Sequence, residues 1–263
     1  MTASAVPGPE RAPLVAAAGG SLVAGLLAAV LVARSLNGAI ALYDPGISTS
    51  AGVFILHGLV PYRDFWLLYG PLAGYVSAAV TALTPPDTAV VKVMGLALIV
   101  CLAAAGTFVL WPFTRPPFAI AISAVAAALA PTVGGLELSS WQCAMTAALV
   151  AAGIAARSRS RRGDLLTGIV AGVAFLFRLD VGAYIAIALA LTYRRRDQLI
   201  GFLAVTVPVT VAYLLLVPLD RLFEQLIWYP LVGVRTYRSL PNPSAPITAP
   251  ECRMLREPTT QRL

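Results

Sequence analysis

Long apolar segments separated by short runs of arginine constrain this chain more than any other feature. The segments lie at 14–33, 65–83, 89–111, 118–133, 141–156, 165–177, 181–193 and 199–217. Apolar residues make up 59% of the chain and charged residues 12%, whereas about 25% of residues are charged in a soluble domain. A water-soluble globule and a disordered chain are both excluded, because each needs far more polar surface. The pattern predicts an all-α, multi-pass protein of the cell membrane.

Length decides which of these segments can cross a bilayer. A span needs about 20 apolar residues, and the segments 14–33, 89–111 and 199–217 reach that length. The segments 118–133 and 141–156 reach it only with their polar flanks included. The first segment is longer than the apolar region of a cleaved signal peptide, which has about 7–15 residues. We therefore expect it to be an uncleaved anchor.

Three segments are too short to cross directly. A Gly-Pro pair at 70–71 interrupts the segment 65–83, because proline removes a helical hydrogen bond and clashes with the preceding turn. The remaining helix would be about 18 Å long at 1.5 Å per residue, against a hydrocarbon core of about 30 Å. The segments 165–177 and 181–193 would each reach about 20 Å. We expect short surface helices in the first region and a bent helix pair in the second.

The arginine runs on either side of this pair predict its direction. They are Arg157, Arg159, Arg161 and Arg162 before the pair, and Arg194, Arg195 and Arg196 after it. Arginine is in excess in cytoplasmic loops, so both runs are predicted to be cytoplasmic and the apex of the pair external. The net charge of +7 is explained by such runs, so nucleic acid is not an expected partner.

Counting back along the chain predicts the rest of the topology. The loop at 134–140 becomes external and the loop at Arg115 cytoplasmic, so the segment 89–111 runs inward. The first segment, 14–33, runs outward from a cytoplasmic N-terminus. The outward direction of this segment and the inward direction of 89–111 are compatible only if the segment 65–83 does not cross the membrane. The predicted divisions are a cytoplasmic N-terminus at 1–13, a membrane domain at 14–217 with an external loop at 34–88, and an external interfacial segment with a disordered tail at 218–263.

Charged residues of the predicted external face are the candidates for chemistry. Asp44, just beyond the first span, can act as a general base on a hydroxyl, or it can stabilise a turn before Pro45. Arg178 can contact a phosphate bidentately, or it can form an ion pair with Asp180. The remaining candidates are Arg63, Asp64, Glu137, Arg235 and Arg238, for which the alternatives are local ion pairs, a helix-end charge and surface anchoring.

Six short runs also carry a family resemblance: Tyr43–Gly46, Gly58–Trp66, Tyr69–Leu72, Phe175–Gly182, Tyr229–Pro230 and Arg238–Pro241. The first three together resemble the first external loop of GT-C membrane glycosyltransferases, above all the family 39 and aminoarabinose-transferase-like branch. The fourth is similar to that branch's bent helix pair, and the last two are similar to a later stretch of bacterial members. The likeness covers about residues 14–243.

The resemblance implies a helix bundle with a GT-C-like N-terminal module. It implies transfer of a sugar from a polyprenyl-phosphate donor to a lipid or cell-envelope acceptor at the external face. Asp44 matches the first-loop acid that serves as base or orients the acceptor, and Glu137 matches the second-loop acid loosely. Arg178 loosely matches the basic residue near the donor phosphate, and we expect Arg235 and Arg238 to assist it in neutralising that phosphate. The resemblance leaves open whether a divalent metal is required.

A non-catalytic membrane protein is the alternative, either a truncated copy of the family acting as a scaffold or a fragment of a transporter. Asp44 is followed by Pro45, where many family members carry a second acid. A transporter would place polar groups near the midplane, often in repeated halves, and neither is visible in the sequence. An enzyme would require Asp44 and Arg178 to face one cavity.

Overall fold

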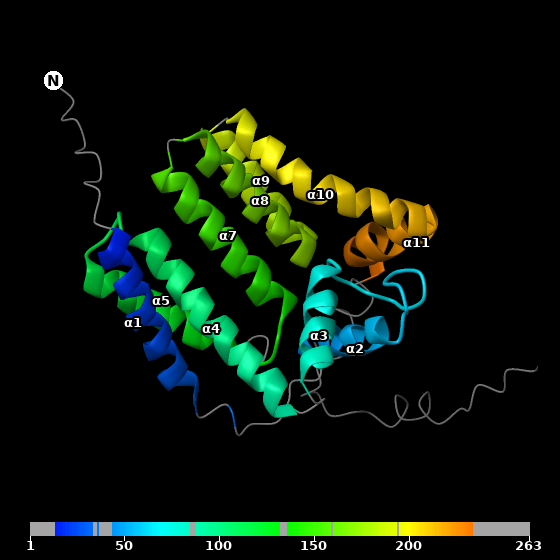
Figure 1. The fold of residues 1–263 in the computed structure, drawn as a ribbon, viewed down its shortest axis with the longest axis horizontal. Helices are drawn as coiled ribbons and strands as arrows, with labels where there is room; N and C mark the ends of the chain where they lie inside the picture. The colour runs from blue at the N-terminus through cyan, green and yellow to red at the C-terminus, as the bar shows by residue number, and fades with distance from the viewer. Residues whose placement is uncertain are drawn as a thin grey trace, which may run out of the picture.

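The computed structural model describes residues 14–33, 36, 44–84, 88–131, 136–158, 160–193 and 195–233. Helices are the only regular secondary structure in this part of the chain, which confirms the all-α class (Figure 1). They are α1 (Leu14–Val32), α2 (Asp44–Leu56), α3 (Leu72–Leu83), α4 (Thr88–Leu110), α5 (Pro116–Leu129), α7 (Ser140–Arg157), α8 (Arg161–Phe177), α9 (Leu179–Tyr193), α10 (Arg196–Leu216), α11 (Leu219–Phe223) and the π-helix η2 (Glu224–Gly233).

Three of the described helices, α1, α4 and α10, are long and apolar enough to cross a membrane. They coincide with the three segments whose length alone predicts a span. Helix α5 has 14 residues, or about 21 Å at 1.5 Å per residue, which is shorter than the roughly 30 Å hydrocarbon core. It begins at Pro116, a residue suited to the first helical position, and ends at Leu129.

The direction of the helices alternates along the chain. A Cβ atom added at Gly20 of α1 would meet Trp111, and one added at Gly25 would meet Val100, so α1 and α4 run antiparallel. Lys92 Nζ, near the start of α4, donates to the backbone oxygen of Leu36, just beyond α1, at 2.7 Å. The C-terminal end of α1 and the N-terminal end of α4 therefore lie together, as the predicted topology requires.

This alternation gathers arginines at one end of the bundle, where α4, α7 and α9 finish and α5, α8 and α10 begin. The described arginines at this end are Arg115, Arg157, Arg161, Arg162, Arg195 and Arg196. Two of them form ion pairs across helices, Arg195 with Asp164 and Arg161 with Asp197. We call this end of the bundle the arginine end. The shared position is confirmed, and the cytoplasmic orientation of this end stays a prediction.

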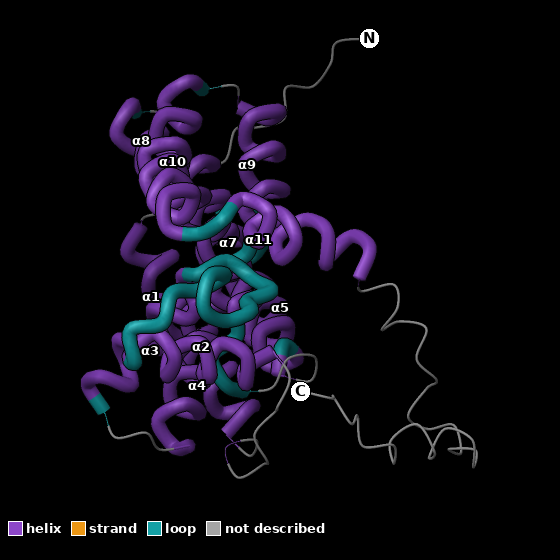
Figure 2. Tube along the Cα trace, turned by 90° about the vertical axis from the view of Figure 1, so that its right-hand side faces the viewer, coloured by secondary structure: helices purple, strands orange, loops and turns teal. Residues whose placement is uncertain are grey.

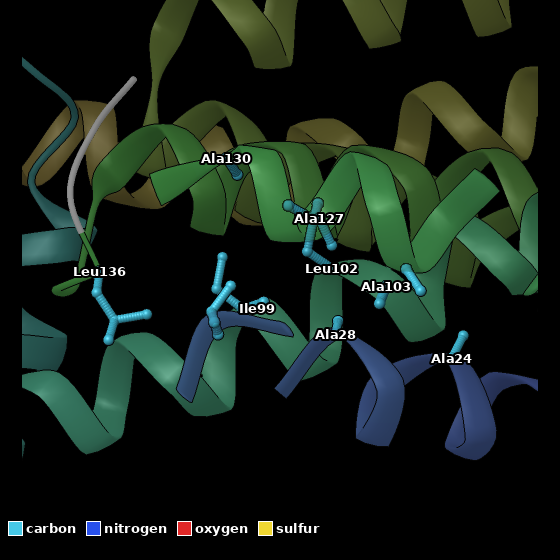
Figure 3. Packing of buried hydrophobic residues seen from close by; sticks show 10 residues of the cluster. Ala24, Ala28, Ile99, Leu102, Ala103, Ala127, Ala130 and Leu136 are labelled. Carbon is cyan, nitrogen blue, oxygen red and sulfur yellow. The ribbon is translucent and has the colours of Figure 1, made fainter. Parts of the chain in front are cut away.

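Small side chains let the helices approach closely. Figure 3 shows α1, α4 and α5 meeting through alanines such as Ala24, Ala103 and Ala127, all buried, with Ile99 and Leu102 filling the space between them. In hydrocarbon the helices gain little by hiding apolar surface, so close van der Waals packing between small residues has to hold them together.

The chain bends sharply between α8 and α9. Helix α8 ends at Phe177, Arg178 is extended with φ −156° and ψ 115°, and α9 begins at Leu179. A Cβ atom at Gly182 would overlap the backbone of Phe175, so the two arms of the bend pack closely. The predicted bent pair is confirmed, and a single straight helix is excluded.

Helix α8 is longer than the apolar pattern predicts. Its first residue is Arg161, because Ser160 caps the helix by accepting a hydrogen bond from Gly163 N at 3.2 Å. A serine cap satisfies one of the unpaired amide groups of a first turn, and Asp164 adds a favourable negative charge there. The helix therefore measures about 26 Å at 1.5 Å per residue.

Replacing Gly168 with alanine should weaken the contact between α8 and α10. The added Cβ atom would overlap the carbonyl oxygen of Gln198, and overpacking of this kind costs about 1–3 kcal/mol. Gly19→Ala is the control, since nothing lies within 4 Å of a Cβ atom there. Unfolding of both variants by titration with a denaturing detergent measures the difference. Equal stability of the two would contradict the close crossing.

Candidate functional site

The first loop, residues 57–71, packs against two segments that are distant in the sequence. These are the bend between α8 and α9 and the segment after α10, formed by α11 and η2. The loop lies between α11 and the α2–α3 pair (Figure 2). Its contacts form a small core of Ala51, Tyr62, Leu67, Val217 and Leu222. The predicted external loop and the predicted external segment after α10 therefore lie at the same end of the molecule.

Tyr62 fixes the conformation of the loop. Its φ of +66° is unusual for a bulky residue, so other contacts must hold it in place. Its hydroxyl donates to the backbone oxygen of Tyr69 at 2.6 Å, its backbone N–H donates to Phe65 O at 3.0 Å, and its ring lies edge-on to Tyr213 at 5.3 Å. Burial raises the pKa of the Tyr62 phenol, which keeps the hydroxyl protonated as a donor.

Gln225 of η2 joins the loop to the segment after α10. The side chain is 6% exposed. Its Oε1 accepts from Leu67 N at 3.0 Å, and its Nε2 donates to Tyr62 O at 3.0 Å. Trp66 and Tyr229 add an edge-to-face ring contact at 4.5 Å. Gln225 is not among the residues predicted from the sequence, because its only signal is a lone amide within an apolar and aromatic run.

The Gly-Pro pair at 70–71 interrupts the apolar segment as predicted. It also lets the first loop pass close to the bend between α8 and α9. Pro71 is the N-cap of α3, so the helix starts after the break. A Cβ atom at Gly70 would overlap Leu176 O, near the end of α8, so only glycine allows the loop to pass here. The preceding residue, Tyr69, lies under the guanidinium of Arg178, with 4.8 Å from Cζ to the ring centroid.

Arg178 forms the ion pair with Asp180 that was one of its two alternatives, and its contact with a phosphate stays a prediction. Its Nε lies 2.9 Å from Asp180 Oδ1, and the same oxygen accepts from Val181 N at 2.9 Å, so the ion pair is present and also caps α9. The two terminal nitrogens of the guanidinium make no hydrogen bond to any residue that the structure describes. They stay available to an anion, and two parallel N–H groups match a phosphate.

Arg63 and Asp64 form an ion pair that helps to hold the first loop together. Arg63 Nε and Nη2 donate to the two carboxylate oxygens of Asp64 at 2.9 and 2.8 Å, and Asp64 Oδ2 accepts from Val60 N at 2.7 Å. The hydrogen bond from Arg63, followed by that from Val60, keeps the pKa of Asp64 below its usual value. A role for either residue in substrate binding stays a prediction.

The remaining candidates are not brought together by the described residues. Glu137 lies in the loop between α5 and α7 and is 1% exposed, with its backbone close to Gly95 of α4. Asp44 begins α2, but its side chain lies outside the described part of the structure, as do Arg235 and Arg238. The convergence of Asp44, Glu137 and Arg178 on one cavity therefore stays a prediction.

A cleft of about 360 Å³ opens beside the first turns of α2. Its walls come from Gly46, Ile47, Ser50, Ala51 and Phe54 of α2 and from Phe65 and Trp66 of the first loop. The volume lies within the roughly 300–1,000 Å³ of ordinary small-molecule sites. Because α2 starts at Asp44, the helix turn that follows this acid forms part of the cleft wall.

No group of three acidic, histidine or cysteine side chains that could hold a metal occurs among the described residues. Comparison with known proteins found no match to any family model, curated protein or solved structure.

Replacing Gln225 with leucine should loosen the first loop. The change leaves Leu67 N–H and Tyr62 C=O without their partner, and each buried unsatisfied group costs roughly 1–3 kcal/mol. Faster amide hydrogen exchange across residues 59–70 measures the effect. Glu224→Leu, at the exposed neighbouring position, is the control and should exchange as the unmodified protein does. Unchanged hydrogen exchange in Gln225→Leu would show that the Gln225 side chain does not hold the first loop in place.

Proposed function

We propose that the protein is a GT-C-like glycosyltransferase that moves a sugar from a polyprenyl-phosphate donor to an acceptor hydroxyl at the external membrane face. The observation that carries the proposal is the contact between Arg178 of the helix bend and Tyr69 of the first loop. It brings a guanidinium with two available terminal nitrogens to the loop whose sequence resembles that family. Three apolar helices long enough to span suit a lipid-linked donor.

The reaction requires stabilisation of a leaving phosphate. The acceptor oxygen attacks the anomeric carbon, the bond from that carbon to the phosphate oxygen breaks, and the polyprenyl phosphate leaves with the bonding electrons. Arg178 neutralises the charge that develops on this phosphate, which is the commonest way in which fixed charges accelerate such reactions. The ion pair with Asp180 holds the guanidinium through Nε only, so its terminal nitrogens can meet the phosphate.

The acceptor has to lose a proton in the same step. Asp44 is the proposed base, and the adjoining cleft, with two aromatic side chains of the loop and Ser50, is the proposed acceptor site. Phe65 and Trp66 give the cleft apolar walls suited to an acceptor that is itself anchored in the membrane interface. A transporter is less well supported, because Arg178 and the first loop lie together at one end of the bundle, whereas a transporter would gather its polar groups near the middle.

Asp44→Asn should lower the rate of transfer by about 10²–10⁴-fold, the usual contribution of a general base, and leave membrane insertion unchanged. The measurement uses purified protein in lipid with a panel of polyprenyl-phosphate sugars. Asp220→Asn, an exposed acid of α11, is the control and should retain full activity. Full activity of Asp44→Asn would refute its role as base. Absence of transfer by the unmodified chain with every donor would favour the non-catalytic alternative.

A further inference from the structure

A second cavity lies at the arginine end, away from the proposed transfer site. It is a groove of about 510 Å³ between α9 and α10, with α8 as its floor. Its lining is Gly168 and Ala171 of α8, Ala186, Ile187, Leu189 and Ala190 of α9, and Arg195, Arg196, Gln198, Leu199 and Phe202 at the start of α10. The groove is therefore apolar along its length and positively charged at one end.

The charges around the polar end leave a surplus positive charge. Arg195 is held by Asp164 at 2.5 Å and by the backbone oxygen of Ser158 at 2.9 Å. The other nearby acid, Asp197, pairs with Arg161 at 3.2 Å. Arg196 is exposed and makes no ion pair or hydrogen bond with any described residue. Both acids are thus neutralised, and Arg196 is available to an anion.

Gln198 is the second indication of a ligand. The residue is 5% exposed, and neither its amide nitrogen nor its amide oxygen has a hydrogen-bond partner in the described part of the chain. A buried amide without partners is costly. In addition, no side chain caps the N-terminus of α10, where the helix dipole favours negative charge. A ligand with an anionic group and ester oxygens would pair with the Arg196 guanidinium and the N-terminus of α10 through the anion, and would accept a hydrogen bond from the Gln198 amide nitrogen through the esters.

The position of the groove indicates the kind of ligand. Helix α10 is long and apolar enough to span a membrane, and its outward residues Leu199, Leu203 and Val207 are 58%, 43% and 47% exposed. A groove in such a surface opens to lipid acyl chains. Basic pockets between spanning helices on the cytoplasmic side are a known means of holding anionic lipid headgroups.

We propose that this groove binds one anionic glycerophospholipid, with an acyl chain between α9 and α10, its phosphate at Arg196 and its ester region at Gln198. The site is separate from the proposed donor site and does not depend on the glycosyltransferase proposal. Its consequence is that anionic lipid stabilises the packing of α8, α9 and α10.

Titration of the purified full chain in neutral detergent with dioleoyl phosphatidylglycerol tests the proposal. We expect a rise in melting temperature and retention of one lipid per chain in native mass spectrometry, and neither effect with dioleoyl phosphatidylcholine. Arg196→Gln should weaken binding about fivefold, the usual effect of one arginine near a membrane surface. Arg162→Gln, an exposed arginine of the same end that does not line the groove, should bind as the unmodified protein does.

A second variant tests the acyl-chain part of the site. Ala190→Trp fills the groove and should abolish lipid retention. Equal weakening by Arg162→Gln and Arg196→Gln would overturn the proposal, because it would show diffuse attraction by the whole arginine end. An equal rise in melting temperature with inorganic phosphate would overturn the lipid assignment. Dissociation of a dimer by Ala190→Trp, with lipid retention unchanged, would show that a second copy occupies the groove.

Discussion

The cost of placing arginine in hydrocarbon, about 2.5–3.5 kcal/mol per residue at a helix centre on insertion scales, is the constraint on which the rest of the structure depends. Six described arginines share one end of the bundle. Moving that end through a bilayer would cost far more than any single contact within the protein contributes. The alternation of helix direction then decides which loops meet at the opposite end.

The first loop, the bend at Arg178 and the segment after α10 meet at that opposite end. Buried backbone groups without a helical partner need other hydrogen-bond partners, and the first loop satisfies several of its own through specific side chains. Gln225 pairs with two of them and the hydroxyl of Tyr62 with a third. The same contacts set the loop against the bend, so Tyr69 comes under Arg178. The guanidinium of Arg178, which we propose as the phosphate-binding group, therefore lies against the same loop whose Phe65 and Trp66 line the cleft.

The sequence was sufficient for features that depend on local chemistry or on charge. The break at Gly70 and Pro71, the bend at Arg178 and the common position of the arginine runs each follow from a few adjacent residues. It was insufficient where contacts join distant residues. Gln225 bonds a loop more than 150 positions away, and no periodicity indicates such a partner. The early start of α8 at Arg161 depends on the Ser160 cap. The arginines around Ser160 indicate a loop, so the cap was not recognised from the sequence.

Labelling of single cysteines from the two sides of the membrane tests the central claim most directly, in a chain whose three native cysteines are replaced by serine. The account predicts that an impermeant maleimide added to intact cells labels cysteine at Thr84 and at Leu219, and labels cysteine at Arg162 only after permeabilisation. Labelling of Thr84 and Arg162 from the same side, or of Thr84 and Leu219 from opposite sides, would contradict it.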